Sequence, residues 1–308
     1  MAKKRNEDVR ETEVKSDGMR AINKFRVSDA VIMAIIILLC LTCVLPFLHL
    51  GAKSLSSDSF VLAKQVYLWP KGWSFNAYTA VFQDGRMVRA LFFTVYVTLL
   101  FTILGMLVCT CAAYPLSRRR LKGRSFLTFL LMFPMYFSAG LIPTFLLFRD
   151  LNIYDTIWVL ILPLIYSPYN MLIMKTYLQS NIPASLEESA FLDGASNLQI
   201  LGKIVLPLSK PIIATLSLFY AVGRWNAFSD NLYFTKRDDL KMLQYMLYQL
   251  VQSAGDKQSA GLEGVTVTAT AETLSAAMIM FATIPILCVY PFAQRYFVTG
   301  VMIGAVKE

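Results

Sequence analysis

The chain has 308 residues, of which 56% are hydrophobic and 16% charged, and its formal net charge at pH 7 is +9. Soluble domains carry about 25% charged residues, so the composition excludes an ordinary water-soluble protein. The basic residues do not form one patch with interleaved aromatic side chains, which argues against nucleic-acid binding. They lie between apolar runs, as in membrane proteins whose cytoplasmic loops are basic.

A polar leader of 28 residues precedes the first apolar run and mixes eight basic with five acidic residues. The spacing of Met19, Ile22, Phe25 and Val27 beside basic residues predicts an amphipathic helix on the inner membrane surface. The apolar run that follows is long enough to stay in the membrane as an anchor, unlike a cleavable signal peptide. We therefore divide the chain into a cytoplasmic leader, residues 1–28, and a membrane domain, residues 29–308.

Six apolar stretches have about the length of a membrane span, since crossing ~30 Å of hydrocarbon takes roughly 20 helical residues. The weakest, Leu208–Ala227, has Lys210 and Arg224 near its ends, where both side chains can reach an interface. The sequence thus predicts an all-α integral membrane protein with six transmembrane helices. The other five stretches contain no Asp, Glu, Lys or Arg and are Ala30–Leu50, Ala90–Ser117, Ser125–Phe148, Thr156–Met174 and Thr273–Gln294.

The short loops predict the orientation. Pro115–Arg124 holds five basic residues, whereas Arg149–Asp155 holds one basic and two acidic residues. Because cytoplasmic loops are enriched in Lys and Arg, we expect the first loop inside and the second outside. Both termini and the loop between the fourth and fifth spans then face the cytoplasm. In the external segment Ser229–Glu272, apolar residues from Leu240 to Val251 recur at helical spacing and predict a partly buried helix.

The motif search favours neither an enzyme nor a proton-coupled transporter. The chain has no HExxH, GxSxG or Cys/His metal spacing, and its five cysteines lie in apolar runs, as free thiols do. Gly202-Lys203 resembles the end of a phosphate loop, but Ile204 follows where Ser or Thr is required and Asn197 replaces the first glycine. The middle parts of the spans hold no acidic residue, and His49 lies at the outer end of the first. A sodium-coupled carrier that uses backbone carbonyls stays open.

One short acidic segment interrupts the apolar pattern between the fourth and fifth spans. Ser185 and Glu188 have the spacing of a capping box, which predicts the start of a helix, and Gly194 predicts its left-handed end. A second short helix is predicted from Asn197, with Pro207 near the entrance to the next span. A helix of about two turns is not stable alone, so it either packs on its own bundle or docks on a cytoplasmic partner.

This segment resembles the EAA loop of bacterial ABC-importer permeases, E-A-A, three residues, G, nine residues, I-x-L-P. Ser189 in place of the first alanine is the one departure. The resemblance implies that residues about 183–207 form a coupling helix and couple the chain to an ATPase. ATP and Mg would be bound by that partner, and no cofactor, metal or catalytic residue is expected in this chain. The residues expected to couple are Glu188, Ser189, Ala190, Asp193, Gly194, Ile204, Leu206 and Pro207.

Further segments are similar to permeases of maltose-type carbohydrate importers, in particular the MalG-like subunit with six helices. They are Trp69–Tyr78, Ile284-Pro285, Phe292–Val298 and Gly304–Lys307, and the resemblance covers residues 25 to 308. It implies a cell-membrane permease for an oligosaccharide or other carbohydrate. The implied partners are a second, non-identical permease, an ATPase dimer and an extracellular solute-binding protein. A permease for a non-sugar solute is the alternative, followed by a secondary transporter.

Candidate residues for the substrate pathway follow from the chemistry of sugars, which have an apolar face and a polar edge. Aromatic side chains beside amides or hydroxyls in the fourth and fifth spans have that character. The competing interpretation of each residue is packing in the bundle or membership of the interfacial aromatic belt. The candidates are Tyr166, Tyr169, Asn170, Tyr220, Trp225 and Asn226.

Overall fold

The computed structural model describes residues 27–83, 85–255 and 270–305, so the helix predicted in the leader lies outside the described residues. Within these ranges every regular element is a helix, as predicted, and the one extended pairing is an isolated bridge between Ser56 and Trp73. The α-helices are α2 (Val27–Ser54), α3 (Asp58–Leu62), α4 (Asn76–Gln83), α5 (Gly85–Ser117), α6 (Arg124–Met132), α7 (Leu141–Asp150), α8 (Pro168–Asn181), α9 (Ala184–Leu192), α10 (Asn197–Ile200), α11 (Leu206–Leu208), α12 (Lys210–Asn226), α13 (Ser229–Phe234), α14 (Leu243–Gly255) and α15 (Ala271–Ala305). Shorter turns are the 3-10 elements η1 (Phe133–Met135), η2 (Ile157–Leu160), η3 (Leu162–Leu164) and η5 (Asp238–Leu240), and the π-helix η4 (Leu201–Val205).

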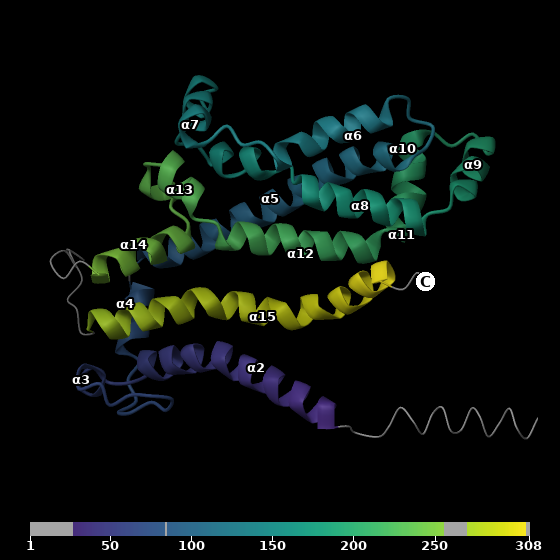
Figure 1. The fold of residues 1–308 in the computed structure, drawn as a ribbon. Coiled ribbons are helices and arrows are strands. Elements are labelled where there is room, and N and C mark those ends of the chain that lie inside the picture. Colours follow the sequence, from purple (N-terminus) through teal and green to yellow (C-terminus); the bar gives the residue numbers. More distant parts are fainter. Residues whose placement is uncertain (1–26, 84, 256–269, 306–308) are drawn as a thin grey trace, which may run out of the picture.

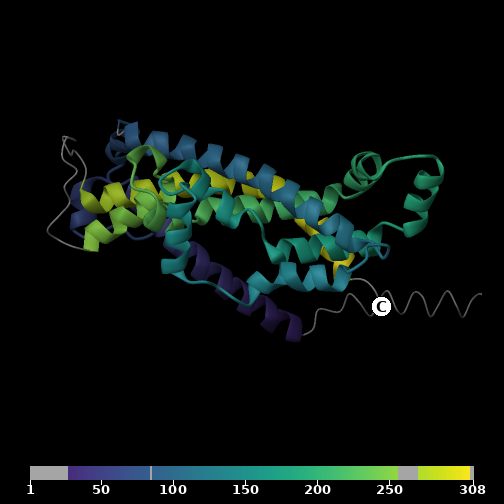
Figure 2. The same ribbon diagram turned by 90° about the horizontal axis from the view of Figure 1, so that it is seen from above.

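The long helices run lengthwise through an elongated bundle (Figures 1 and 2). Helix α5 packs against both α8 and α12, α12 packs against α15, and α15 packs against α2. The amino end of α2, the carboxyl end of α15 and helix α9 lie at the same end of the molecule (Figure 1), which we call the α9 end. Helices α3, α4 and α14 lie at the opposite end, called the α14 end.

Helix α5 forms the centre of the bundle because most of its residues are apolar and Gly105 faces its neighbour α12. A Cβ atom at Gly105 would lie only 2.9 Å from the ring of Tyr220 on α12. Glycine at this position therefore lets α5 and α12 approach closely, as small residues do between membrane helices. The ring of Tyr220 also meets Phe101 of α5 edge-on, with the centroids 5.8 Å apart.

Two described helices are long and apolar enough to cross a membrane, Ser28–Ser54 and Gly85–Ser117. The number rises to 4 when two bent pairs of helices are each taken as one span. One bent pair, Ile157–Leu164 with Pro168–Asn181, turns by 49° where a single helix was predicted. Prolines explain the break, because they lack the N–H that continues a helix and disfavour helical geometry in the preceding residue.

The predicted continuous helix Ser125–Phe148 is also wrong in detail. The structure divides it into α6, the single turn η1 and α7, with Pro134 in the turn. Gly140, which precedes α7, has a φ of +83°. Proline and a left-handed glycine both interrupt a helix, and an average of hydropathy over a window does not register either of them.

The chain turns sharply between α11 and α12. The segment Asn197–Leu208, which contains the π-helix η4, meets Lys210–Asn226 at 82°. Ser209, at the corner, is fully buried. We call this corner the elbow.

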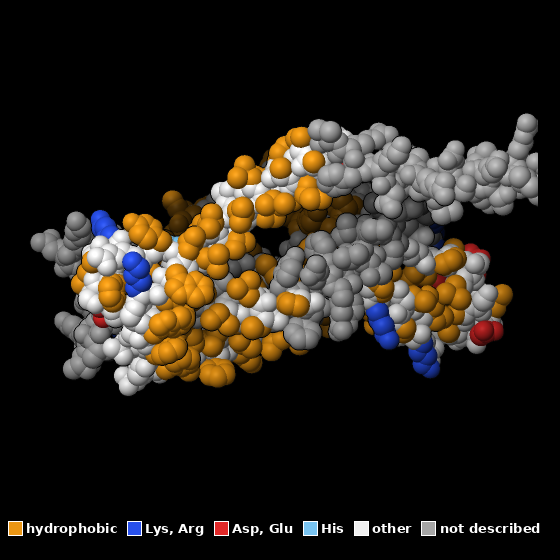
Figure 3. All heavy atoms as spheres, turned by 90° about the horizontal axis from the view of Figure 1, so that it is seen from below, with side chains coloured by type: hydrophobic (Ala, Val, Ile, Leu, Met, Phe, Trp, Pro, Cys, Tyr) orange, Lys and Arg blue, Asp and Glu red, His pale blue; other side chains and the backbone are white. Residues whose placement is uncertain are grey.

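Hydrophobic side chains dominate the middle of the molecule, and Lys, Arg, Asp and Glu gather toward its two ends (Figure 3). None of the residues in the apolar part of α2 is buried by the rest of the described chain. The predicted helix around Leu240–Val251 is confirmed as α14, whose Leu243 is buried beside α4 and α15. The 5 cysteines are all free, as predicted.

Candidate functional site

Helix α9 begins at Ala184 directly after Pro183, so the predicted capping box at Ser185 and Glu188 is wrong. Proline has a fixed φ and favours the first positions of a helix, and Ser185 therefore lies inside the first turn. A capping box does form at the start of α10. There Gln199 N–H donates to Ser196 Oγ over 3.3 Å, and Ser196 N–H donates to Gln199 Oε1 over 2.8 Å.

The end of α9 follows the prediction. Gly194 has a φ of +82°, and its N–H donates to the carbonyl of Phe191 over 3.0 Å. The N–H of Ala195 donates to the carbonyl of Ala190 over 2.9 Å. This pair of bonds is the Schellman motif, in which the left-handed residue is usually glycine because it has no Cβ.

The predicted coupling residues lie on both sides of α9 and along the chain to the elbow. Ala190 is buried in the main core, whereas Glu188, Ser189 and Asp193 are exposed. Ile204 and Leu206 are half-buried, and Pro207 is exposed at the start of α11. Helix α9 stands apart from the long helices (Figures 1 and 2). Two large apolar side chains near it face outward, Leu192 with 89% and Leu198 with 80% exposure.

A buried ion pair attaches α9 to the end of α5, and the sequence reasoning missed it. Arg118 Nη2 and Glu187 Oε1 lie 2.7 Å apart, and the two side chains are 9% and 6% exposed. The carboxylate expected to matter was Glu188, the next residue, which is exposed. A signal was present, because a basic loop and an acidic loop were both predicted on the cytoplasmic side and opposite charges attract.

A second arginine of the same loop contacts α9 and α10. Arg120 Nη2 donates to Asn197 Oδ1 over 2.6 Å, and its guanidinium lies 4.2 Å from the ring centroid of Phe191. A guanidinium is planar, so it can donate a hydrogen bond while it stacks on an aromatic face. Beside these contacts is a cavity of about 550 Å³, which both arginines, Asn197 and Leu198 help to line.

A second cavity, of about 640 Å³, lies between α8, α12 and α15. Two of the predicted pathway residues line it: Tyr169, which is 55% exposed, and Asn170, which is 7% exposed. The rest of its lining is apolar and consists of Leu218, Phe219, Val222, Ile286 and Leu287. An aromatic ring, an amide and apolar walls are groups that can hold a neutral organic solute.

The other predicted pathway residues do not line this cavity. Tyr166 donates its hydroxyl hydrogen to the carbonyl of Leu131 over 2.8 Å, and Tyr220 is buried against α5. Trp225 is buried among α4, α14 and α15, and the amide of Asn226 donates to the carbonyl of Val222 over 3.0 Å. The packing interpretation therefore fits the buried Tyr220 and Trp225, whereas Tyr166 is half-buried and Asn226 is exposed.

Arg224 is buried in the protein, so the expectation that its side chain reaches an interface is wrong. Its guanidinium donates to the carboxylate of Asp230, to the carbonyl of Leu160 over 2.9 Å and to the sulfur of Met242 over 2.9 Å. These bonds join α12, η2, α13 and the start of α14. Burial of a charge is costly unless it is paired and hydrogen-bonded, and both conditions are met here.

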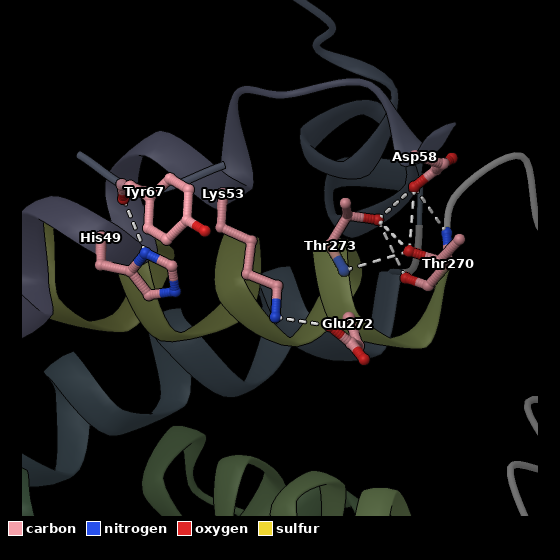
Figure 4. Close-up of polar contacts among 7 residues, drawn as sticks. All are labelled: His49, Lys53, Asp58, Tyr67, Thr270, Glu272 and Thr273. Atoms are coloured by element: carbon pink, nitrogen blue, oxygen red, sulfur yellow. Dashed lines mark hydrogen bonds and ion pairs between the residues drawn. The ribbon is translucent and has the colours of Figure 1, made fainter. Parts of the chain in front are cut away.

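The first span and the last helix are joined by a polar cluster at the α14 end (Figure 4). Asp58 Oδ1 accepts hydrogen bonds from Thr270 N–H over 2.9 Å, Thr270 Oγ1 over 3.0 Å and Thr273 Oγ1 over 2.5 Å. Burial alone would raise the pKa of Asp58, but these hydrogen bonds outweigh it and hold the pKa below its ordinary value. Lys53 Nζ lies 2.6 Å from Glu272 Oε2, and its hydrogen bond and charge lower the pKa of Glu272.

His49 lies in the same region, and its Nδ1 is 2.6 Å from the carbonyl of Tyr67 (Figure 4). This contact holds the ring near the carboxyl end of α2, and its position at a membrane interface stays a prediction. Among the described residues no group of three or more His, Cys, Asp or Glu side chains has the arrangement of a metal site. Two candidate sites result. One is the cavity lined by Tyr169 and Asn170, and the other is the α9 region, by which we mean α9, α10 and the turn between them.

Comparison with known proteins identifies relatives along almost the whole chain. The permease YtcP of a polygalacturonan/rhamnogalacturonan transport system in Bacillus subtilis (strain 168) is 41% identical over 285 residues, which are 92% of this chain and 99% of that protein. Protein LplC of the same organism is 38% identical over 264 residues, which are 86% of this chain and 89% of LplC.

Solved structures give the same assignment. A bacterial ABC transporter involved in the import of the acidic polysaccharide alginate has a chain that superimposes with a TM-score of 0.80 and is 31% identical, covering 89% of this chain and 99% of that chain. Residues 102–303 match the family described as binding-protein-dependent transport system inner membrane component. With its helical bundle, its apolar spans and this match, the chain belongs to the family of inner membrane components of binding-protein-dependent transport systems, and its role is that of a transporter subunit and not of an enzyme.

Proposed function

We propose that this chain is one permease subunit of an ATP-driven importer of oligosaccharides. It pairs with a second, non-identical permease, α9 docks on one subunit of a cytoplasmic ATPase dimer, and an extracellular binding protein delivers the sugar. ATP and Mg are bound by the ATPase and not by this chain. Closure of the ATPase dimer moves the paired coupling helices and opens the pathway outward, and ATP hydrolysis resets it.

The observation that carries the proposal is the shape of the α9 region. Helix α9 stands apart from the bundle, and Leu192 at its end and Leu198 on α10 leave apolar surface uncovered. Uncovered apolar side chains of this size indicate a contact with another protein. The spacing from Glu188 to Pro207, which resembles the EAA loop, supports the ATPase as that protein.

Cross-linking tests the docking. We expect a cysteine at Leu192 to cross-link to the ATPase encoded with this transporter in native membranes, in a chain whose own cysteines are alanine. A cysteine at Leu127, which lies on α6 and away from α9, is the matched control and should not cross-link. Failure of the Leu192 cysteine to cross-link in membranes that import sugar would reject α9 as the docking site.

The proposed topology has six crossings with both termini inside. The helices α2, α5, α12 and α15, the interrupted pair α6 and α7, and the bent pair of η2–η3 with α8 supply the crossings. The α9 end would then be cytoplasmic, which is supported by the basic residues between α5 and α6. A membrane-impermeant thiol reagent should label Lys122→Cys only from inside and Asp150→Cys only from outside. Labelling of both from one side would contradict six crossings.

The names of the relatives and the second cavity support an oligosaccharide as the substrate. YtcP is named for the transport of polygalacturonan and rhamnogalacturonan, and the solved transporter is involved in the import of the acidic polysaccharide alginate. The described lining of the cavity contains Tyr169 and Asn170 but no charged residue, so it supports a sugar ring and does not specify a charge. The discriminating assay is uptake of neutral and uronic oligosaccharides by membranes that contain the whole transporter.

Variants at the cavity sharpen that assay. Tyr169→Ala and Asn170→Ala should lower sugar uptake or change the preference among sugars while the complex still assembles. Asn226→Ala is a matched control, because Asn226 lies on α12 but does not line the cavity. Unchanged uptake and preference in both cavity variants would remove this cavity from the pathway.

A further inference from the structure

The α9 region has few connections to the rest of the molecule besides the chain itself. One part is apolar and joins the main core through the buried Ala190 and Ile200 and the half-buried Phe191 and Ala195. The polar part consists of the pair Arg118–Glu187 and the contacts of Arg120 with Phe191 and Asn197. The cavity of about 550 Å³ between the basic loop and α10 leaves space where side chains would otherwise fill the gap. The two arginines therefore connect α9 and α10 to the end of α5.

The pair Arg118–Glu187 is suited to keep α9 attached to the end of α5 when α9 is displaced. Both side chains are almost fully buried, so salt in the cytoplasm screens their attraction little. Arg118 Nη1 also lies 3.5 Å from the carbonyl of Ile182, just before α9. Removal of either partner would leave the other charge buried and uncompensated, which is far less favourable than removal of both.

The other end of the connection is a single long helix. Arg118 directly follows α5, whose 33 residues extend about 50 Å at 1.5 Å per residue. Near the opposite end of α5, Thr94 Oγ1 accepts a hydrogen bond from Leu243 N–H at the start of α14 over 2.9 Å. Phe101, about two turns further along, has the guanidinium of Arg224 5.9 Å from its ring centroid. One helix thus links the ion pair beside α9 to the buried polar bonds at the α14 end.

We propose that Arg118 and Glu187 are positioning residues that transmit the movement of α9 into α5, and through α5 to the segment before α14. This inference rests on the proposed function, because it needs the ATPase to move α9. It assigns a role to the basic loop between α5 and α6 beyond orientation in the membrane. Arg120 supports the connection by fixing the start of α10 through Asn197.

The test measures sugar imported per ATP hydrolysed in proteoliposomes that contain the whole transporter. Arg118→Gln, Glu187→Gln and the double variant are compared with Arg119→Gln, which removes an exposed charge from the same loop. We expect the double variant to assemble with the ATPase and hydrolyse ATP, but to import at least about 5-fold less sugar per ATP, the size of a typical coupling between sites. Arg119→Gln should keep the ratio of the wild type.

The outcomes separate the inference from the proposed function. The Leu192 cysteine cross-link is measured in the same membranes, so docking is scored independently of coupling. A normal cross-link together with a normal import ratio in the double variant would overturn the role of Arg118 and Glu187 and leave docking intact. Absence of the cross-link in the otherwise wild-type transporter would instead reject the proposed function. If the single variants fail to assemble, the double variant still decides, because it leaves no buried charge unpaired.

Discussion

The two ends of the molecule use buried ion pairs in different ways. At the α14 end, Arg224 and Asp230 are surrounded by bonds that join four separate segments, and Asp58 of α3 adds a second polar cluster with Thr270 and Thr273 at the start of α15. At the α9 end, Arg118 and Glu187 join one projecting helix to one long helix. The α14 end is thus held by many mutually supporting contacts, whereas the α9 end is held at a few points and leaves large apolar side chains uncovered.

This difference indicates that the two ends differ in how easily their segments can move. Segments that share many buried contacts resist separate movement, whereas a segment with few contacts can move as a unit. The α9 end has the second character and also carries the exposed Leu192 and Leu198. Three changes, from the largest expected effect to the smallest, would break or sharpen the contrast between the ends.

Arg224→Met should have the largest effect. It removes the guanidinium that Asp230, Leu160 and Met242 contact, and it leaves Asp230 charged and 7% exposed. We expect a loss of about 3–5 kcal/mol in the free energy of unfolding, as for other buried pairs that lose one partner. The measurement is thermal unfolding of the purified chain in detergent.

Two further variants serve as controls for Arg224. Arg237→Met breaks the exposed pair with Asp239 and should lower the unfolding midpoint far less, because solvent screens an exposed pair. The double change Arg224→Met with Asp230→Leu should recover most of the loss, because no charge stays buried. A loss as small as that of Arg237→Met would mean that Arg224 does not hold the α14 end together.

Gly194→Val should have an intermediate effect confined to the α9 end. Its φ of +82° strains any residue with a Cβ, by about 1 kcal/mol or more for a branched side chain. No atom lies within 4 Å of the position of a Cβ, so the cost comes from the backbone and not from a clash. We expect ATPase attachment to weaken by about 5-fold, since 1.4 kcal/mol is tenfold.

Asparagine at position 194 distinguishes the effect of backbone strain from the effect of adding any side chain. Asparagine tolerates left-handed geometry better than other residues with a Cβ, so Gly194→Asn should keep most of the attachment. The comparison is a pull-down of the ATPase with purified transporter, together with unfolding of the chain alone. Equal attachment in the valine variant and the wild type would show that the turn after α9 needs no left-handed residue for docking.

Asp58→Asn should have the smallest effect and should depend on pH. Because the folded pKa of Asp58 is lowered, its carboxylate contributes stability above its unfolded pKa, and this contribution is lost as the pH falls through the folded pKa. We expect the variant to be less stable by about 1 kcal/mol at pH 7, given the partial exposure of Asp58. The difference from the wild type should shrink below about pH 4.

The pH series is read as the difference between two unfolding midpoints, so other groups that titrate in both proteins cancel. Asp150→Asn, at an exposed carboxylate, gives the baseline and should change the midpoint little at any pH. A difference between Asp58→Asn and the wild type that stays constant from pH 7 to about pH 3 would exclude the charge of Asp58 as its cause.

The helical character of the fold was predictable because it depends on local composition. Apolar runs of about 20 residues predicted α2 and α5, and the helical spacing of apolar residues from Leu240 to Val251 predicted α14. The breaks within the predicted helix Ser125–Phe148 were harder to predict. Pro134 and Gly140 are visible in the sequence, but an average of hydropathy over a window does not register them. The number of membrane crossings stays a prediction.

The candidate site, too, was predictable only in part. The end of α9 at Gly194 was predictable because a left-handed turn has a strong local preference for glycine. The start was not, because Ser185 and Ser196 have the same spacing to a Glu or Gln and only Pro183 distinguishes them. The pair Arg118–Glu187 joins residues far apart in the sequence, and no local pattern identifies which of two adjacent glutamates is buried.

The elbow before α12 has a mechanical consequence. Because Asn197–Leu208 meets α12 at 82°, a thrust along the first segment has almost no component along the axis of the second. Such a thrust would tilt α12 about the buried corner at Ser209 and would not slide it lengthwise. Because the bonds of Arg224 hold the far end of α12 to three other segments, a displacement near α10 would load those bonds through the length of α12.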